Sequence, residues 1–553
     1  MTSQSQSNDA LAQQYIEEYL QGFLQFTPTE ATSIGVHTWD GDLEDRTVVS
    51  VQNEILRLES SRKQLLDMIP SVSPDCAIDC RTTLAHLDGQ LHFLKDQCDW
   101  KRNPIYYNDL TTDGIFVLLA KNFAPLELRA QLINQRASKI PALLETAIQN
   151  LNDCPKIMVE KALELLDGVR FLFVQSVPEE FSKLSDQSIT ETYQALLEKI
   201  VAALDQYENF LRDDLLPEAK NNFALGRELF SRRLAREELV DIPLDDITNA
   251  GWAALRDTQQ AFCTVAQQIK PDGDPREVFE SMSREHPTAE ELVPEVENLM
   301  RTLRKFLIDQ DVVTIPSEEQ CDIDLMPEFM WAFACIWPAG MLETVATGGE
   351  YYVAPVRSAW SPEKQEEHLQ NFNYPALANV SAHEAWPGHF LESLYTRQVE
   401  RLARKAFLCY SSNEGWAHYT EQMMIEVDYH HGDPKYVLAQ LSDALLRLCR
   451  YVVAIGLHTG TMTLEEGIAV FEKEGYLNHH VAEEEAIRGT FDPMYLNYAL
   501  GKLMLLKLRD DYRAQQGAAY TLKGFHNAFL SCGSIPIPLA RELMLGPDNG
   551  SML

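Results

Sequence analysis

Two short segments in the last third of the chain contain side chains of the types that bind metal ions. Residues 383–389 read H-E-A-W-P-G-H, so two imidazoles, His383 and His389, lie near the carboxylate of Glu384. Neutral imidazole nitrogens are common protein ligands for zinc. The segment therefore predicts two ligands of a metal site, with an acidic side chain beside the first of them.

The spacing of the two histidines requires a break in the helix that carries them. In the helical HExxH motif the ligands lie four residues apart and share one face. Here they lie six apart, which on a straight helix separates them by about 240°. Pro387 lacks a backbone donor and Gly388 tolerates unusual dihedral angles. We therefore expect the helix with His383 and Glu384 to kink or end near Pro387, which would bring His389 back toward His383.

A third ligand is expected from residues 413–421, which read N-E-G-W-A-H-Y-T-E. Glu414, His418 and Glu421 lie at positions i, i+4 and i+7, so they share one face of a helix. Two His and one Glu with an open fourth position form the ligand set of a catalytic zinc, and Mn or Co accept similar ligands. We expect Glu421, one helical step from His418, to lie behind the ligands and orient an imidazole. The alternative is a solvated acidic face with incidental histidines.

The elements that must position these residues are predominantly helical. Apolar residues recur every three or four positions in the first helix, at Leu11, Tyr15, Ile16, Tyr19, Leu20 and Phe23. Similar patterns follow at about 51–68, 82–97, 126–151, 157–175, 189–215, 249–269 and 289–309. The clearest strand-like stretches are Val312–Ile315 and Tyr351–Val356. The sequence therefore predicts a mostly α fold with a small β element around 312–356. Residues 1–310 are expected to form a helical wall that limits access to the catalytic region 311–553, within one integrated unit.

The charge and the motifs that are missing exclude several classes of function. The sequence has 47 Lys and Arg against 83 Asp and Glu, a formal charge of −36, which repels nucleic acid and anionic membranes. It contains no signal-peptide pattern, no apolar run long enough to span a bilayer, no Gly-rich phosphate loop and no G-x-S-x-G motif. We therefore expect a soluble, cytoplasmic protein without nucleic-acid or membrane partners, which uses neither nucleotide chemistry nor a catalytic serine.

The two metal-binding segments resemble the paired motifs of the bacterial family known as domain of unknown function 885. The resemblance extends over nearly the whole chain, including G-G-E-Y-Y-V-A-P-V at 348–356 and the segment at 450–467. It implies a gluzincin-type zinc metallopeptidase with a large helical, zincin-like fold, similar to the thermostable carboxypeptidases and oligopeptidases. It also implies one zinc ion held by His383, His389 and Glu414, with Glu384 as general base.

Hydrolysis of an amide also needs a group that stabilises the negative charge developing on the carbonyl oxygen. Three polar side chains within late apolar helices are candidates: His458, Arg488 and Tyr498. Each has an alternative role. His458 would be a hydrogen-bonded core histidine, Arg488 an ion-pair partner of Glu484 or Glu485, and Tyr498 a packed aromatic residue.

These observations and the resemblance together predict a zinc-dependent hydrolase, most simply a metallopeptidase that cleaves short peptides with a metal-activated water. Two alternatives stay open. The same groups polarise any carbonyl, so the substrate could be another small amide or an ester. A non-catalytic helical binding protein could also retain a vestigial metal site. The sequence does not indicate the direction of cleavage, the physiological substrate or the oligomeric state.

Overall fold

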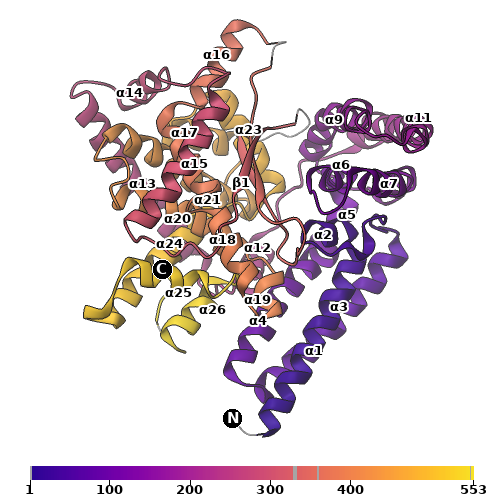
Figure 1. Cartoon of the computed structure of the whole chain (residues 1–553), viewed down its shortest axis with the longest axis horizontal. Coiled ribbons are helices and arrows are strands. Elements are labelled where there is room, and N and C mark those ends of the chain that lie inside the picture. Colours follow the sequence, from indigo (N-terminus) through magenta and orange to yellow (C-terminus); the bar gives the residue numbers. More distant parts are fainter. Residues whose placement is uncertain (1–2, 328–332, 358–359, 548–549) are drawn as a thin grey trace. The chain divides into compact units, whose positions relative to one another are not determined.

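Helices make up most of the structure, and one small sheet lies among them (Figure 1). The computed structural model describes residues 3–327, 333–357, 360–547 and 550–553. The predicted mostly α class is confirmed. Within the described residues, no helix combines the length and the apolar character needed to cross a membrane.

The chain forms two compact units. Unit 1 consists mainly of the first 223 residues together with Ala339–Thr347. Its helices are α1 (Ser3–Phe26), α2 (Pro28–Ser33), α3 (Val48–Met68), α4 (Pro74–Leu91), α5 (Asp99–Arg102), α6 (Pro104–Ala120), α7 (Leu126–Ala137), α8 (Ile140–Asn150), α9 (Lys156–Phe171), α10 (Val177–Phe181) and α11 (Gln187–Asn209).

Unit 2 contains most of the chain from Ala224 to Leu553. Its helices are α12 (Arg227–Glu237), α13 (Leu244–Ile269), α14 (Pro275–Met282), α15 (Leu292–Asp309), α16 (Pro362–Asn371), α17 (Tyr374–Glu384), α18 (His389–Gln398), α19 (Leu402–Ala406), α20 (Tyr410–Glu426), α21 (Pro434–Thr459), α22 (Leu464–Glu474), α23 (His479–Phe491), α24 (Asn497–Gln516), α25 (Leu522–Leu530) and α26 (Ile537–Leu545).

Residues 224–310 lie in unit 2, whereas the sequence pattern grouped them with the first 223 residues. The physical reason is the packing of α13 along α21. Gly251 lets the ring of Tyr451 approach the α13 backbone, and the Tyr451 hydroxyl donates to the carbonyl of Ile247 at 2.9 Å.

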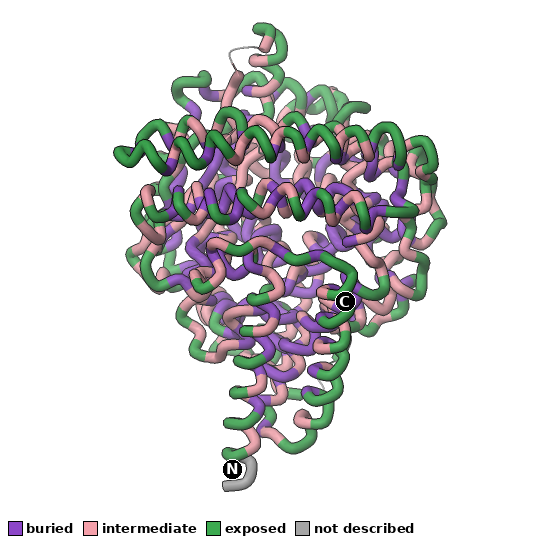
Figure 2. Tube along the Cα trace, turned by 90° about the vertical axis from the view of Figure 1, so that its right-hand side faces the viewer, coloured by how far each residue is buried: buried purple, intermediate pink, exposed green. Residues whose placement is uncertain are grey.

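Helical periodicity is visible as a pattern of burial along the helices, where buried and exposed residues alternate within successive turns (Figure 2). In α1 the side chains of Ile16, Tyr19 and Leu20 are buried, as the spacing predicts. Leu11 is 56% exposed, and the buried face begins at Ala12 instead.

The sheet has three strands, β1 (Cys321–Leu325), β2 (Ala334–Pro338) and β3 (Gly349–Val353), in the order β1-β3-β2. Strand β3 pairs parallel with β1 and antiparallel with β2, with Ile336 opposite Tyr351. The predicted β element therefore exists, and β3 overlaps the expected strand at 351–356.

The expected strand at Val312–Ile315 is wrong, because side chains rather than a neighbouring strand satisfy this backbone. The carbonyl of Val312 accepts from His526 Nδ1 at 2.9 Å. The amide of Thr314 donates to Asn527 Oδ1 at 3.0 Å, and the Thr314 carbonyl accepts from the hydroxyl of Tyr395 at 3.0 Å.

Candidate metal centre

The histidine-bearing helix ends where the sequence predicts a break. Helix α17 stops at Glu384 and α18 starts at His389. A Cβ at Gly388 would collide with the carbonyl oxygen of His383, so the turn closes tightly over the end of α17 only because residue 388 is glycine. The turn thereby brings the two imidazole rings to a centroid separation of 4.9 Å.

Two tryptophans hold this turn against the helix that carries Glu414. Trp386 lies within the turn and Trp416 lies on α20, and both are almost completely buried. The indole Nε1 of Trp416 donates to the carbonyl of Pro387 at 2.9 Å. This bond couples the position of α20 to the segment between the two histidines.

Helix α20 completes a group of three potential ligands. The Oε2 atom of Glu414 lies 3.4 Å from Nε2 of His383 and 3.4 Å from Nε2 of His389. One ligand atom from each of the three residues lies within 4.8 Å of the others. These are the residues that the spacing and the family resemblance indicated as ligands.

The surroundings of the three residues favour a bound cation. Glu414 Oε2 and His389 Nδ1 are buried without a hydrogen-bond partner among the described residues. Burial opposes a charge on His389, but the negative charge of Glu414 outweighs it and raises the pKa of His389 well above its usual value. Burial also opposes ionisation of Glu414, yet the two imidazoles lower its pKa. Two imidazoles and one carboxylate match the donor set of a catalytic zinc.

Glu421 lies behind His383, in the middle of a buried polar network. Its Oε1 atom is 2.7 Å from Nδ1 of His383 and 3.0 Å from Nη2 of Arg447. Its Oε2 atom is 3.1 Å from Nδ1 of His418. Burial lowers the pKa of His418 to about 3, so this imidazole is neutral near pH 7. His418 therefore contacts Glu421 rather than the three ligand residues.

His389 has an acidic neighbour that the sequence analysis missed. Oε2 of Glu392 lies 3.8 Å from Nδ1 of His389. Glu392 is itself held by Asn413 Nδ2 at 2.7 Å and by the hydroxyl of Ser534 at 3.1 Å. Its position three residues after His389, on the same face of α18, is a sequence signal that could have identified it.

Glu384 is anchored by strand β2. Its Oε2 atom accepts from the backbone amide of Ile336 at 3.1 Å. Burial raises the pKa of Glu384, and the nearby His383 and His389 oppose the rise. Because Ile336 donates to Glu384, its amide points away from the neighbouring strand β3, on the side of β2 where the described residues form no further strand.

Two tyrosines lie near the ligand group. The ring of Tyr498 is stacked near that of His383, with centroids 6.3 Å apart, and meets the ring of Tyr410 edge-on at 5.7 Å. Burial and the charge of Glu414 raise the pKa of Tyr498. The sequence analysis missed Tyr410, although it lies four residues before Glu414 and thus on the same helix face.

His458 lies away from the ligand group. Its Nε2 atom is 2.7 Å from the carbonyl of Gly489, and its ring is stacked on Phe230. It lies 11 residues beyond Arg447 on α21, which is about 16 Å along the helix axis. The structure thus gives His458 the contacts of a core histidine and does not place it beside His383.

Arg488 pairs with a residue other than the two that the sequence suggested. Its Nη2 and Nε atoms donate to Oδ2 of Asp492, at 2.9 and 3.2 Å, instead of to Glu484 or Glu485. Burial lowers the pKa of Arg488, but Asp492, Tyr498 and Tyr410 outweigh this effect and raise it.

A buried carboxylate, Glu238, ties together the starts of the two helices that carry these residues. One oxygen accepts from the amide of Ser411 at 3.1 Å and from the thiol of Cys409 at 2.9 Å, where α20 begins. The other accepts from Asn497 Nδ2 at 2.8 Å, at the first residue of α24. Glu238 therefore helps to set the position of Tyr410 relative to Tyr498.

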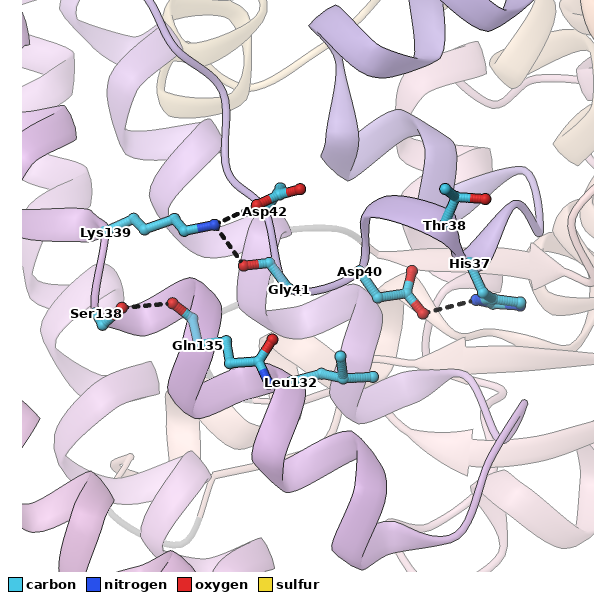
Figure 3. A pocket seen from close by; sticks show the side chains of 9 residues that line it. All are labelled: His37, Thr38, Asp40, Gly41, Asp42, Leu132, Gln135, Ser138 and Lys139. Atoms are coloured by element: carbon cyan, nitrogen blue, oxygen red, sulfur yellow. Dashed lines mark hydrogen bonds and ion pairs between the residues drawn. The ribbon is translucent and has the colours of Figure 1, made fainter.

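Unit 1 contains a separate polar pocket of about 400 Å³ (Figure 3). His37 is held there between two carboxylates, with Nδ1 2.9 Å from Asp40 and Nε2 2.9 Å from Glu343. The Lys139 ammonium contacts Asp42 on the other side of the pocket. The lining residues are His37, Thr38, Asp40, Gly41, Asp42, Leu132, Gln135, Ser138 and Lys139.

Comparison with known proteins identifies relatives without an assigned activity. Residues 28–544 match the model of a family described as "Bacterial protein of unknown function (DUF885)". No curated protein matches the chain.

Two solved structures share the fold. One is a "putative lipoprotein of unknown function" from Shewanella oneidensis, with a TM-score of 0.79 and 23% identity over 96% of this chain and 99% of that chain. The other is a "putative lipoprotein" from Colwellia psychrerythraea, with a TM-score of 0.76 and 19% identity over 98% of this chain and 99% of that chain.

Proposed function

The chain belongs to the bacterial DUF885 family of proteins of unknown function, and for this member we propose a zinc-dependent hydrolase that cleaves short peptides. The observation that carries the proposal is the convergence of His383, His389 and Glu414, with ligand atoms within 4.8 Å of one another, beside Glu384. When bound there, zinc lowers the pKa of a coordinated water toward about 7 and polarises the substrate carbonyl.

Glu384 is the proposed general base. It directly follows His383 at the end of α17, so its carboxylate lies beside the ligand group without belonging to it. The amide of Ile336 holds Oε2, which leaves Oε1 to accept the proton of the attacking water and pass it to the leaving amine.

Glu421 has a different task in this proposal, because it acts through His383. By accepting from Nδ1, it would fix the tautomer whose Nε2 lone pair is available to a metal ion held together with Glu414. Arg447 neutralises the charge of Glu421 inside the protein and thereby keeps the carboxylate ionised.

Tyr498 is the proposed donor to the carbonyl oxygen as negative charge develops on it. Its ring lies beside His383, and a phenol donates one hydrogen bond without adding a charge. Tyr410 is the neighbouring candidate, because its ring contacts Tyr498.

The edge strand β2 supports a peptide substrate. Among the described residues β2 lies at the edge of the sheet, and because its amide at Ile336 is bonded to Glu384, an extended substrate backbone would pair with the other outward-facing groups of this strand. Such pairing recognises the peptide main chain and would place its carbonyls beside Glu384.

The test is a library of short peptides incubated with the purified protein, with metal content measured in parallel. We expect cleavage that a chelator abolishes and added zinc restores. Glu384→Gln should retain zinc but lower turnover by at least about 10²-fold, whereas Glu367→Gln, at an exposed position, should change neither.

Three results would contradict the proposal. Near-normal turnover by zinc-loaded Glu384→Gln would exclude the general-base role. A zinc-loaded wild-type protein that cleaves no peptide but hydrolyses small amides or esters would replace the peptidase by the broader hydrolase. If the zinc-loaded protein hydrolyses neither peptides nor small amides or esters, a binding protein with a vestigial metal site becomes the better interpretation.

A further inference from the structure

Three arginines interact with Tyr498, and they differ in how completely carboxylates neutralise their charge. The Arg447 side chain is 10% exposed and pairs with the fully buried Glu421. The Arg450 side chain is 11% exposed and forms a two-pronged pair with Glu485, at 2.6 and 2.7 Å. Both guanidinium groups therefore already have a carboxylate partner inside the protein.

Arg488 is the more accessible cation of the three. Its side chain is 35% exposed. Asp492 engages Nε and Nη2 through a single oxygen, Oδ2. A guanidinium has five N–H donors, so the Nη1 group lies outside this pair. Arg488 therefore has both the exposure and the additional donors that an incoming anion needs.

The position of Arg488 relative to the ligand group follows from helix α23. Glu485 and Arg488 lie three residues apart and share one face of this helix. Glu485 binds Arg450, whose guanidinium carbon is 5.5 Å from the centroid of the Tyr498 ring. Arg488 follows one helical turn later and interacts electrostatically with the hydroxyls of Tyr498 and Tyr410.

The same two hydroxyls also interact with Glu414, one of the three proposed ligands. The two tyrosines therefore interact both with the ligand group and with Arg488. A substrate whose scissile carbonyl is at the ligand group, beside Tyr498, would therefore have a neighbouring group near Arg488.

We propose that Arg488 binds a carboxylate of the substrate close to the scissile bond, so that the enzyme acts on the end of a peptide. The inference rests on the peptidase function proposed above. A guanidinium matches a carboxylate in a planar, two-pronged geometry. The net charge of −36 repels anionic substrates at long range, so their binding needs a local cation such as this one. Two sources share the chemistry: the α-carboxylate of the chain end and an acidic side chain near it.

The experiment compares three forms of one cleavable peptide with wild-type zinc enzyme. They are the free acid, the C-terminal amide, and the C-terminal amide with Glu as its last residue. We expect kcat/KM to be highest for the free acid. Comparable cleavage of the Glu-containing amide would assign the subsite to an acidic side chain, and poor cleavage of both amides would assign it to the chain end.

Variants then test Arg488 itself. Arg488→Gln should raise KM for the free acid by about 10- to 100-fold, the scale of one charged hydrogen-bonded contact. KM for the plain amide should stay within a few-fold of wild type. Arg488→Lys keeps the charge but loses the planar, two-pronged geometry of the guanidinium. It should therefore recover part of the preference for the free acid over the amide. Asp492→Asn removes the competing carboxylate and should lower KM for the free acid. Arg513→Gln, at an exposed ion pair, is the matched control.

Zinc content and thermal stability of each variant separate these effects from misfolding. If wild-type enzyme cleaves acid and amide equally, the carboxylate subsite is wrong while the peptidase function stands. If Arg488→Gln lowers kcat equally for both forms, Arg488 acts on the oxyanion instead, which also overturns the inference. If zinc-loaded enzyme cleaves no peptide at all, the proposed function fails and this inference fails with it.

Discussion

Glu421 shows at the scale of one residue how a charge can be buried deep inside the candidate site. Its two oxygens contact His383, His418 and Arg447, and Arg447 contributes the compensating positive charge. An isolated buried carboxylate would protonate, but these partners lower the pKa of Glu421 well below its usual value, against the effect of burial. The result is an ionised acceptor that orients His383.

The ligand assignment predicts two different effects of losing a carboxylate. Glu414→Ala removes a proposed ligand, so we expect no stoichiometric zinc in elemental analysis of the purified protein. Glu421→Gln leaves all three ligands in place but weakens the hold on His383, so zinc affinity should fall by about 10- to 100-fold. A full equivalent of zinc at unchanged affinity in Glu414→Ala would show that the third ligand lies elsewhere.

The two tyrosines allow a second prediction at this scale. If the Tyr498 hydroxyl stabilises the oxyanion, Tyr498→Phe should lower kcat and kcat/KM together by roughly 10- to 10³-fold, with zinc content unchanged. Tyr410→Phe is the matched comparison. A large loss in that variant, with none at Tyr498, would assign the hydrogen bond to Tyr410.

At the scale of elements, the site depends on how closely α20 and α24 approach each other. Gly415 and Gly501 face each other across this contact, where a Cβ on Gly415 would lie 2.6 Å from the Cα of Gly501. A Cβ on Gly501 would collide with the carbonyl oxygen of Ser411. Because α20 carries Glu414 and α24 carries Tyr498, this approach sets the distance between the two residues.

Gly501→Ala should therefore lower both stability and activity, because backbone atoms cannot move aside as a flexible side chain can. We expect a decreased melting temperature and a lower kcat with wild-type enzyme as reference. Gly467→Ala, also within a helix, is the control. Its Cβ would lie 3.2 Å from the Cγ1 of Val453, and alanine favours helix by up to about 1 kcal/mol over glycine. A Gly501→Ala variant as stable and active as Gly467→Ala would contradict this account.

At the scale of the whole molecule, unit 1 is closed by contacts between very distant parts of the chain. His37 and Glu343 are 306 residues apart, and their hydrogen bond brings Ala339–Thr347 against the loop after α2. The amide of Leu342 donates to the carbonyl of Ile34 at 2.8 Å in the same contact. Burial opposes a charge on His37, but Asp40 and Glu343 outweigh it and raise the pKa of this imidazole.

This shift predicts how stability depends on pH. A raised pKa in the folded state means that protonated His37 stabilises the fold below its unfolded pKa of about 6.5, and that the contribution disappears as the pH rises through the folded value. The difference in melting temperature between wild type and His37→Ala should therefore be larger near pH 6 than near pH 9.

His430→Ala provides the control for that measurement. Burial lowers the pKa of His430 to about 4, so the folded imidazole stays neutral while the unfolded one becomes protonated below about pH 6.5, and the contribution of this residue to stability should change in the opposite direction, being smaller near pH 6 than near pH 9. A His37→Ala difference that is constant with pH, or that grows toward pH 9, would show that the charge on His37 does not stabilise unit 1.

The sequence by itself determined the features that depend on local geometry. Helical spacing predicted the long helices, and the same spacing placed Glu414 and Glu421 on one face of a helix. The Pro387–Gly388 pair predicted the end of the helix behind His383, because the conformational limits of these residues act within one turn. The residue types that could bind a metal were likewise readable directly, since ligand chemistry belongs to each side chain by itself.

Only the tertiary structure decided which distant side chains meet. It separated Tyr498 from His458, although both lie in late helices with similar patterns, and it added Tyr410 and Glu392 to the surroundings of the site. It also replaced the expected strand at 312–315 by contacts with side chains such as Asn527. The physical reason is that spacing along a helix specifies a face, whereas the partner of that face depends on how helices pack and on where a carboxylate such as Glu238 joins their ends.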